Sequence, residues 1–168
     1  MDFVVLFHQL GKEQAQKLHE DDRLYDVGDT IFIGSTPLGN SSLSLYLREY
    51  HDNALSMYPA IGNVKEGRLP EEAIEIALSE DALQYLGLDA VIGDTVSLDL
   101  SVSVMDGSLS ELEYSADFVL TGILESSYIG YASGTVEGIV GEGTAEELLP
   151  EEYLLYSTDF KTYDKQNF

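Results

Sequence analysis

Histidine is the side chain that most often carries acid–base or metal chemistry near neutral pH, and this chain has three of them. They are His8, His19 and His51, and none belongs to an H-E-x-x-H pattern, which would place two metal ligands on one helix face. We interpret all three as ordinary strand or surface residues. The histidines therefore predict neither a catalytic base nor a metal centre.

Carboxylates are abundant, since Asp and Glu number 31 against 8 Lys and Arg. The adjacent pairs Asp21-Asp22 and Glu151-Glu152 lack the one-residue ligand spacing and central glycine of an EF-hand loop, although a weak surface calcium site stays open as an alternative. A glycosidase pair would need two carboxylates in a cleft with aromatic platforms, and the chain has no Trp. We expect no catalytic residue, no cofactor and no metal site.

Nucleophiles and phosphate-binding turns are equally scarce. No serine lies in a G-x-S-x-G turn, and the chain has no cysteine, which excludes a thiolate nucleophile and a disulfide. The turn at Gly141-Glu-Gly-Thr144 lacks the lysine of a P-loop, and Glu142, Glu146 and Glu147 would repel a phosphate. We therefore predict that this turn caps a helix and that the protein is not an enzyme.

Tyrosine is the residue type that best suits a binding surface, because it combines apolar area with a polar hydroxyl. The chain has eleven tyrosines against six phenylalanines. Tyr128, Ile129 and Tyr131 lie among Ser and Gly in an expected loop, where such side chains are unfavourable unless something covers them. We predict that these three residues contact a partner; the alternative is that the loop folds back and buries them.

The net charge of −23 at pH 7 excludes several classes of partner. Nucleic acids and anionic membrane surfaces bind clustered Lys and Arg, which this chain lacks. The longest apolar stretch, Phe118–Leu124, has the length of a strand and not of a membrane-spanning helix. An apolar strand follows directly after Met1-Asp2 with no basic region before it, so we expect a piece of a longer protein and no signal peptide.

Apolar periodicity and caps predict the elements that position these residues. Strands are expected at 3–7, 24–33, 44–50, 75–78, 95–104, 117–125, 136–140 and 152–158. Short helices are expected at 12–20, 80–86 and 144–149. Ser79 should cap the second helix and Gly87 should end it, while Thr144-Ala-Glu-Glu147 fits a capping box for the third.

These elements predict a single domain over residues 1–168 of the α+β class, with two lobes. A β-α-β lobe should comprise about 1–66 plus 150–168, and a more β-rich lobe about 67–149. The warrant is the change near Gly67 from a mixed pattern to long alternating strands. The clearest alternation, at 95–104, should pair with 117–125.

The segment 66–124 carries short patterns in a fixed order. They are Glu66-Gly-Arg-Leu-Pro-Glu71, Glu75-Ile-Ala-Leu-Ser-Glu-Asp-Ala-Leu83, Leu86-Gly87, Ile92-Gly-Asp-Thr-Val96 and Phe118-Val-Leu-Thr-Gly-Ile123. This order resembles the extracytoplasmic, MacB-like periplasmic core domain of ABC transporter permeases of the FtsX/MacB type. The opening at 7–22 resembles the start of such domains just after their first transmembrane helix.

The resemblance implies a non-catalytic domain on the extracellular side of the cell membrane, between the first two helices of a multi-pass permease. A separate cytoplasmic ATP-binding subunit would hydrolyse ATP, and the domain would couple that hydrolysis to export or to an extracellular peptide, lipoprotein or cell-wall partner. The acidic surplus and the absence of cysteine suit a Gram-positive cell surface. The alternatives are a freestanding secreted binding or adhesin module and a small hydrolase that uses carboxylates.

Overall fold

The computed structural model describes residues 3–10, 16–17, 20, 24–39, 42–51, 62–105, 109–125, 134–150, 153–154 and 156–162. Within these residues the chain forms nine strands and two named helices. In chain order they are β1 (Phe3–Leu10), β2 (Leu24–Pro37), β3 (Ser44–Tyr50), β4 (Val64–Gly67), β5 (Glu75–Ser79), α2 (Glu80–Tyr85), β6 (Thr95–Met105), β7 (Leu109–Leu124), β8 (Thr135–Val140), α3 (Thr144–Leu148) and β9 (Tyr156–Thr162).

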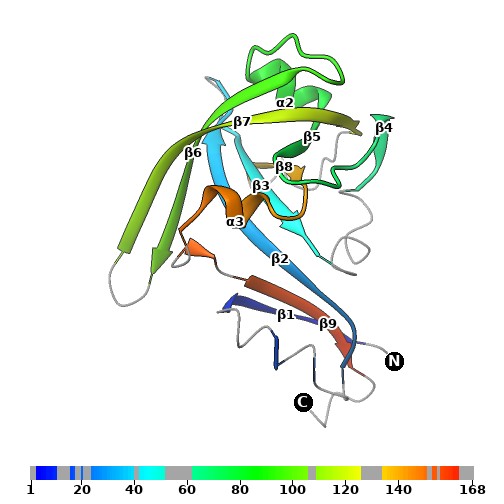
Figure 1. Ribbon diagram of the computed structural model, residues 1–168, viewed down its shortest axis with the longest axis vertical. Helices are drawn as coiled ribbons and strands as arrows, with labels where there is room; N and C mark the ends of the chain where they lie inside the picture. Colours follow the sequence, from blue (N-terminus) through cyan, green and yellow to red (C-terminus); the bar gives the residue numbers. More distant parts are fainter. Residues whose placement is uncertain are drawn as a thin grey trace.

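Six of the strands close into a barrel. The order around it is β2-β3-β8-β5-β7-β6, and β6 returns to β2 through the pair Ser35 and Ser101. The neighbours β3–β8 and β5–β7 are parallel, and the other neighbours are antiparallel. The long β6–β7 ribbon curves around one side of this barrel (Figure 1). The closure pairs strands that are far apart in the sequence, so the barrel is a product of tertiary structure.

The barrel interior is filled by the apolar half of each alternating strand. Along β6 the inward side chains are almost completely buried, and the residues between them face outward. The same holds for β3, where Leu45 and Leu47 are fully buried. The largest buried side chains of this core are Phe118, Ile31, Ile33, Leu38, Leu45, Leu47, Ile76, Leu78, Leu120 and Val96.

The α+β class expected from the sequence is wrong, because the protein is mostly β with a closed six-stranded barrel. The two helices are short: α2 has six residues and α3 has five. Of the first expected helix, 12–20, the described part is helical only at 16–17. Capping residues mark where a helix begins but do not indicate how much of the fold is helical. Closure of a barrel pairs distant strands and therefore leaves no pattern in the local sequence.

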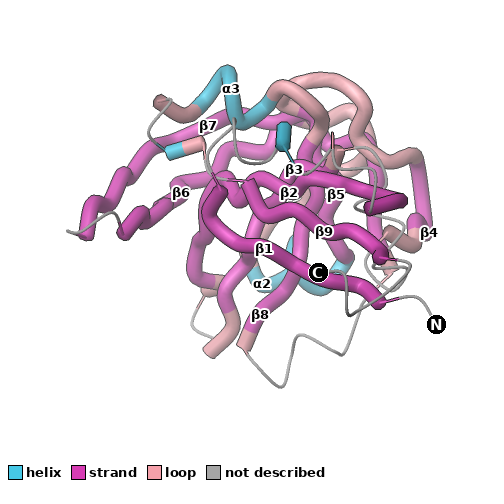
Figure 2. Tube along the Cα trace, turned by 90° about the horizontal axis from the view of Figure 1, so that it is seen from below, coloured by secondary structure: helices cyan, strands magenta, loops and turns pink. Residues whose placement is uncertain are grey.

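A three-stranded sheet of β1, β9 and β2 extends from the barrel (Figures 1 and 2). β9 lies between β1 and β2 and is antiparallel to both, so the last strand joins the opening of the chain as predicted, although it spans 156–162 instead of 152–158. β2 continues from this sheet into the barrel, where it meets β3 and β6. The division into two lobes stays a prediction.

Local predictions around α2 and the β6–β7 ribbon are confirmed. The Ser79 hydroxyl accepts the amide N–H of Ala82 at 3.2 Å, and Gly87 has the left-handed φ of +70° that ends a helix. β6 and β7 pair along their whole length, from Thr95 opposite Val119 to Met105 opposite Leu109. β7 therefore begins eight residues earlier than the expected start at 117, since 117 − 109 = 8.

The capping box expected at the start of α3 is wrong. The N-cap is Gly143, and no side chain of the cap residue bonds the helix. The Thr144 hydroxyl instead accepts the Ile74 N–H at 2.8 Å and donates to the Gly141 carbonyl at 2.7 Å. Thr144 thus ties α3 to the turn before β5.

Two of the patterns that carry the family resemblance form one packing unit. Gly67 of β4 lies opposite Gly122 of β7. A Cβ atom on Gly122 would lie 2.3 Å from the Arg68 carbonyl oxygen, and one on Gly67 would lie 2.2 Å from that of Thr121. The Arg68 N–H also donates to the Thr121 carbonyl at 2.9 Å. The backbones can approach this closely only because both residues are glycine.

Candidate functional site

The predicted partner contact cannot be placed in the fold. Tyr128, Ile129 and Tyr131 all lie outside the described residues, and the prediction that they contact a partner stays a prediction. The same applies to His19, and for His8 the backbone alone is described, in β1. The polar arrangements that can be built from the described residues lie elsewhere, on the β6–β7 ribbon and at the end of β3.

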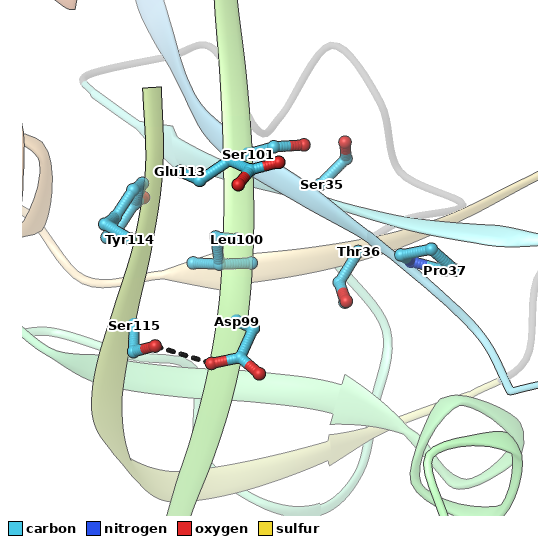
Figure 3. A pocket seen from close by; sticks show the side chains of 9 residues that line it. All are labelled: Ser35, Thr36, Pro37, Asp99, Leu100, Ser101, Glu113, Tyr114 and Ser115. Atoms are coloured by element: carbon cyan, nitrogen blue, oxygen red, sulfur yellow. Dashed lines mark hydrogen bonds between the residues drawn. The ribbon is translucent and has the colours of Figure 1, made fainter. Parts of the chain in front are cut away.

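A groove of about 470 Å³ opens where β2 crosses the β6–β7 ribbon (Figure 3). Each of the three strands contributes three consecutive residues. The lining comprises Ser35, Thr36 and Pro37 of β2, Asp99, Leu100 and Ser101 of β6, and Glu113, Tyr114 and Ser115 of β7. The volume falls in the range that small-molecule sites occupy.

The groove exists because β2 and β6 share a single pair of residues. Ser35 lies opposite Ser101, and in the described chain no other residue of β6 pairs with β2. β2 continues through Thr36 and Pro37, but there it pairs with β3 on its other side. The two strands cross here (Figure 3), and among the described residues β6 has no pairing partner on the β2 side next to Ser101.

A tyrosine holds the crossing of the strands in place. The Tyr114 hydroxyl donates to the Ile33 carbonyl of β2, and burial raises the pKa of this phenol, so it stays a neutral donor. Next to it, Gly34 lets β6 approach, because a Cβ there would lie 3.0 Å from Leu100 Cβ and 3.3 Å from the Ser101 carbonyl oxygen. The floor of the groove is therefore fixed by contacts within the barrel.

Serines and carboxylates alternate across the outer face of the ribbon. Four successive cross-strand pairs each join one serine to one acid: Ser97 with Asp117, Asp99 with Ser115, Ser101 with Glu113, and Ser103 with Glu111. The Ser97 hydroxyl donates to Asp117 at 2.6 Å, and the Ser115 hydroxyl donates to Asp99 at 2.5 Å. We call this surface, the outer face of β6 from 97 to 103 and of β7 from 111 to 117, the serine–acid face.

The serine–acid face has no basic partner among the described side chains. Three described basic residues form ion pairs with acids outside this face: Arg48 with Glu137, Lys65 with Glu80, and Arg68 with Glu75. The alternation at 95–104 predicted a strand but did not indicate which residues of β7 would lie opposite its polar side chains. The register that places a serine opposite each acid is a property of the β6–β7 pairing.

A second polar arrangement buries a carboxylate at the end of β3. Glu49 is 1% exposed; one of its oxygens accepts the Ala145 N–H at 2.9 Å, and the other contacts His51 Nε2. The bond to Glu49 raises the pKa of His51, burial opposes this, and the negative charges of Glu142 and Asp29 add to it. His51 thus lies directly after β3 and is tied to a buried carboxylate, a pairing that the sequence did not indicate.

The Glu49–His51 pair resembles the base and orienting acid of a catalytic triad, but the described residues provide no third member. No hydroxyl of a described residue is hydrogen-bonded to the His51 ring. Glu49 instead completes the hydrogen bonds of the first turn of α3, which is the role of a cap. We interpret the pair as a structural tie between β3 and α3.

In the part of the chain that the structure describes, no group of three or more His, Asp or Glu side chains is placed to hold a metal ion. Among the same residues, no helix has the length and apolar character needed to cross a membrane.

Comparison with protein-family models and with curated proteins finds no match to this chain.

Proposed function

We propose that this chain is a non-catalytic extracellular domain of an ABC transporter permease of the FtsX/MacB type. In this role it relays movement between the membrane helices, driven by a separate ATP-binding subunit, and an extracellular substrate or partner. The ordered patterns at 66–124 support the family, and two of them meet at the Gly67–Gly122 crossing. A domain that transmits movement needs a stiff connection between the end near the membrane and the end that meets a partner.

The observation that carries this proposal is the continuity of β2. Its first half pairs with β9, from Leu24 to Ile31, and its second half pairs with β3, from Thr30 to Pro37. Thr30 and Ile31 pair on both sides at once, so the two sheets overlap along one strand. Movement applied to the β1–β9–β2 sheet would reach the barrel through hydrogen-bonded backbone and not through a flexible linker.

The position of β1 and β9 suits insertion into a membrane protein. These strands are antiparallel neighbours with Phe3 opposite Thr162. Because β1 and β9 pair in this way, Phe3 and Thr162 lie at the same end of one sheet, an arrangement that suits a domain inserted between two membrane helices (Figure 1). This geometry supports the permease reading but is shared by other inserted domains.

An antibody raised against the chain tests the proposal in the native cells. We expect it to detect a protein much larger than 18.5 kDa that stays in the membrane after carbonate washing. The epitope should be cleaved when intact cells are treated with protease, and an ATP-binding subunit should co-purify with the protein. A form released from the cells and free of any ATP-binding subunit would contradict the proposal.

That contrary result would favour a freestanding secreted binding module. The observation that favours a secreted binding module is the groove, since a polar groove at a strand edge serves a secreted binding protein as well as a permease domain.

A further inference from the structure

We propose that the groove between β2 and the β6–β7 ribbon binds an extended basic segment of a partner protein. The segment pairs with the open edge of β6 beside Ser101 and directs Lys or Arg side chains to Asp99 and Glu113. This inference goes beyond the permease proposal and does not depend on it.

The open edge of β6 is the first reason. β6 is paired with β7 at every position from Thr95 to Met105, but with β2 only at Ser101. Strand edges with free N–H and C=O groups are the sites at which extended peptides add to a sheet. The groove is lined by Asp99 and Leu100 of β6 and by Thr36 and Pro37 of β2, so it lies along this edge next to Ser101.

The chemistry of the lining is the second reason. Asp99 and Glu113 are exposed, and Ser35, Thr36, Ser101 and Ser115 line the same groove. No described Lys or Arg neutralises either carboxylate. A hydroxyl-rich, anionic groove is complementary to ammonium and guanidinium groups, which both donate hydrogen bonds and carry positive charge.

The spacing of charge is the third reason. Side chains of an extended peptide alternate between two faces, so every second residue would lie on the outer side of the sheet. On that side the ribbon presents Asp99 of β6 and Glu113 of β7, which are diagonal neighbours in the ladder. A segment with Lys or Arg at alternate positions therefore directs its positive charges to these two acids.

The groove is also prepared for binding without rearrangement. Tyr114 is bonded to the Ile33 carbonyl, and Leu100 is 2% exposed in the core below. A preformed site saves the free energy of ordering the protein when the ligand binds. The net charge of −23 further attracts a basic segment from a distance.

The test uses the isolated chain and a short synthetic peptide of about eight residues in which Lys and Thr alternate, with both ends blocked. Binding is measured by fluorescence anisotropy at physiological salt, about 150 mM. The variant Asp99→Asn/Glu113→Gln removes the two charges of the groove without changing side-chain size. The matched control Asp89→Asn/Glu147→Gln removes two exposed charges outside the groove.

We expect the groove variant to raise the Kd of the peptide by about fivefold to tenfold and the control variant to leave the Kd nearly unchanged. A peptide with the same charges but N-methylated at alternate residues should lose binding to the unaltered protein, because it cannot pair with a strand edge. The experiment with the N-methylated peptide uses the unaltered protein, so its result does not depend on whether a variant folds. In NMR spectra, the amide signals of residues 99–101 should shift with the Lys–Thr peptide.

Four results would overturn the proposal. The first is that the Lys–Thr peptide does not bind, and the second is that the groove and control variants weaken its binding equally. The third is that the N-methylated peptide binds as tightly as the Lys–Thr peptide, and the fourth is that spermine, a polycation without a peptide backbone, does so. The last three would show attraction to a polyanion without a built site. None of these results bears on the membrane location of the protein, so the failure of this inference and the failure of the permease proposal are distinguishable.

Discussion

The carboxylate of Glu49 and the backbone amide of Ala145, 2.9 Å apart and 96 positions apart in the sequence, join the end of β3 to the first turn of α3. Glu49 is almost completely buried and also contacts His51. A side chain from a distant strand thus satisfies a helix amide that the helix's own cap residue, Gly143, leaves free. The consequence is that the stability of α3 depends on a residue of the barrel.

Replacing Glu49 by Ala should lower the free energy of unfolding by about 2–4 kcal/mol, because the Ala145 amide and His51 both lose their partner inside the protein. Glu49→Gln keeps an acceptor for the amide and should cost less, about 1–2 kcal/mol. Urea unfolding at pH 7 measures both. Glu147→Gln, on the exposed side of α3, is the control and should change stability by less than about 0.5 kcal/mol. Equal effects for Ala and Gln at position 49 would contradict the capping role.

His51 should make the protein's stability depend on pH. The Glu49 bond, together with the charges of Glu142 and Asp29, raises the pKa of His51 in the folded state above its ordinary value of 6.5. The folded protein therefore holds this proton more tightly than the unfolded chain does. The stabilisation is complete below pH 6.5 and is lost as pH rises through the raised pKa.

The stability difference between the unaltered protein and His51→Gln should therefore be largest near pH 6 and should shrink as pH rises above 6.5. Unfolding titrations of the two proteins across this range provide the measurement. A difference that grows with pH would mean that His51 is neutral in the folded protein.

Gly122→Ala should destabilise the protein through contact with backbone. The new Cβ would lie 2.3 Å from the Arg68 carbonyl oxygen, and a backbone atom cannot move aside as a flexible side chain can. We expect a loss of about 2–4 kcal/mol. The comparison is Gly87→Ala, where a Cβ meets nothing within 4 Å and the cost of about 1 kcal/mol comes only from the positive φ.

Gly87→Asn should recover part of the loss at that position, because Asn tolerates the left-handed region. No residue other than glycine should be accepted at 122. Thermal melts of the three variants decide this, and a Gly122→Ala protein as stable as Gly87→Ala would show that β4 can move away from β7.

Glu75 should contribute stability down to acid pH. The Arg68 guanidinium donates to both Glu75 oxygens, at 2.9 and 2.7 Å, and the amides of Glu71 and Glu72 add two bonds, so the pKa of Glu75 falls from 4.5 to about 2. A carboxyl whose pKa is lowered by folding stabilises the protein above its unfolded value and loses that effect as pH falls through its folded value.

We therefore expect Glu75→Gln to cost about 1 kcal/mol at pH 7, a modest value because the guanidinium is exposed. The difference from the unaltered protein should persist down to pH 4.5 and should vanish between pH 4.5 and about 2. Denaturant titrations of both proteins at several pH values in this interval measure it. A difference already lost at pH 4.5 would show that the pair does not form in solution.

Features that depend on neighbours in the sequence could be predicted. The alternation at 95–104 marks β6, the Ser79 hydroxyl starts α2 and Gly87 ends it. Each of these depends on contacts within one turn or along one strand, and such contacts are present in the residues themselves. The α+β class was wrong because the same local signals give no information on how strands close around a core.

The candidate site could be predicted only in part. The alternation at 95–104 predicted a strand, but nothing in the local sequence indicated that β7 would place an acid opposite each serine at 97, 101 and 103 and a serine opposite Asp99. The Thr144 capping box failed for a related reason: the threonine found a better partner in Ile74, which only the packed barrel brings near.

The sequence by itself determined the composition and the local elements: an acidic chain, alternating strands and short capped helices. The tertiary structure alone decided that Ser35 meets Ser101, that β2 then leaves β6 to form a groove, and that Glu49 reaches Ala145. The physical reason is that these contacts join residues far apart in the chain. Their positions follow from strand register, and closure of the barrel sets the register for all six strands together.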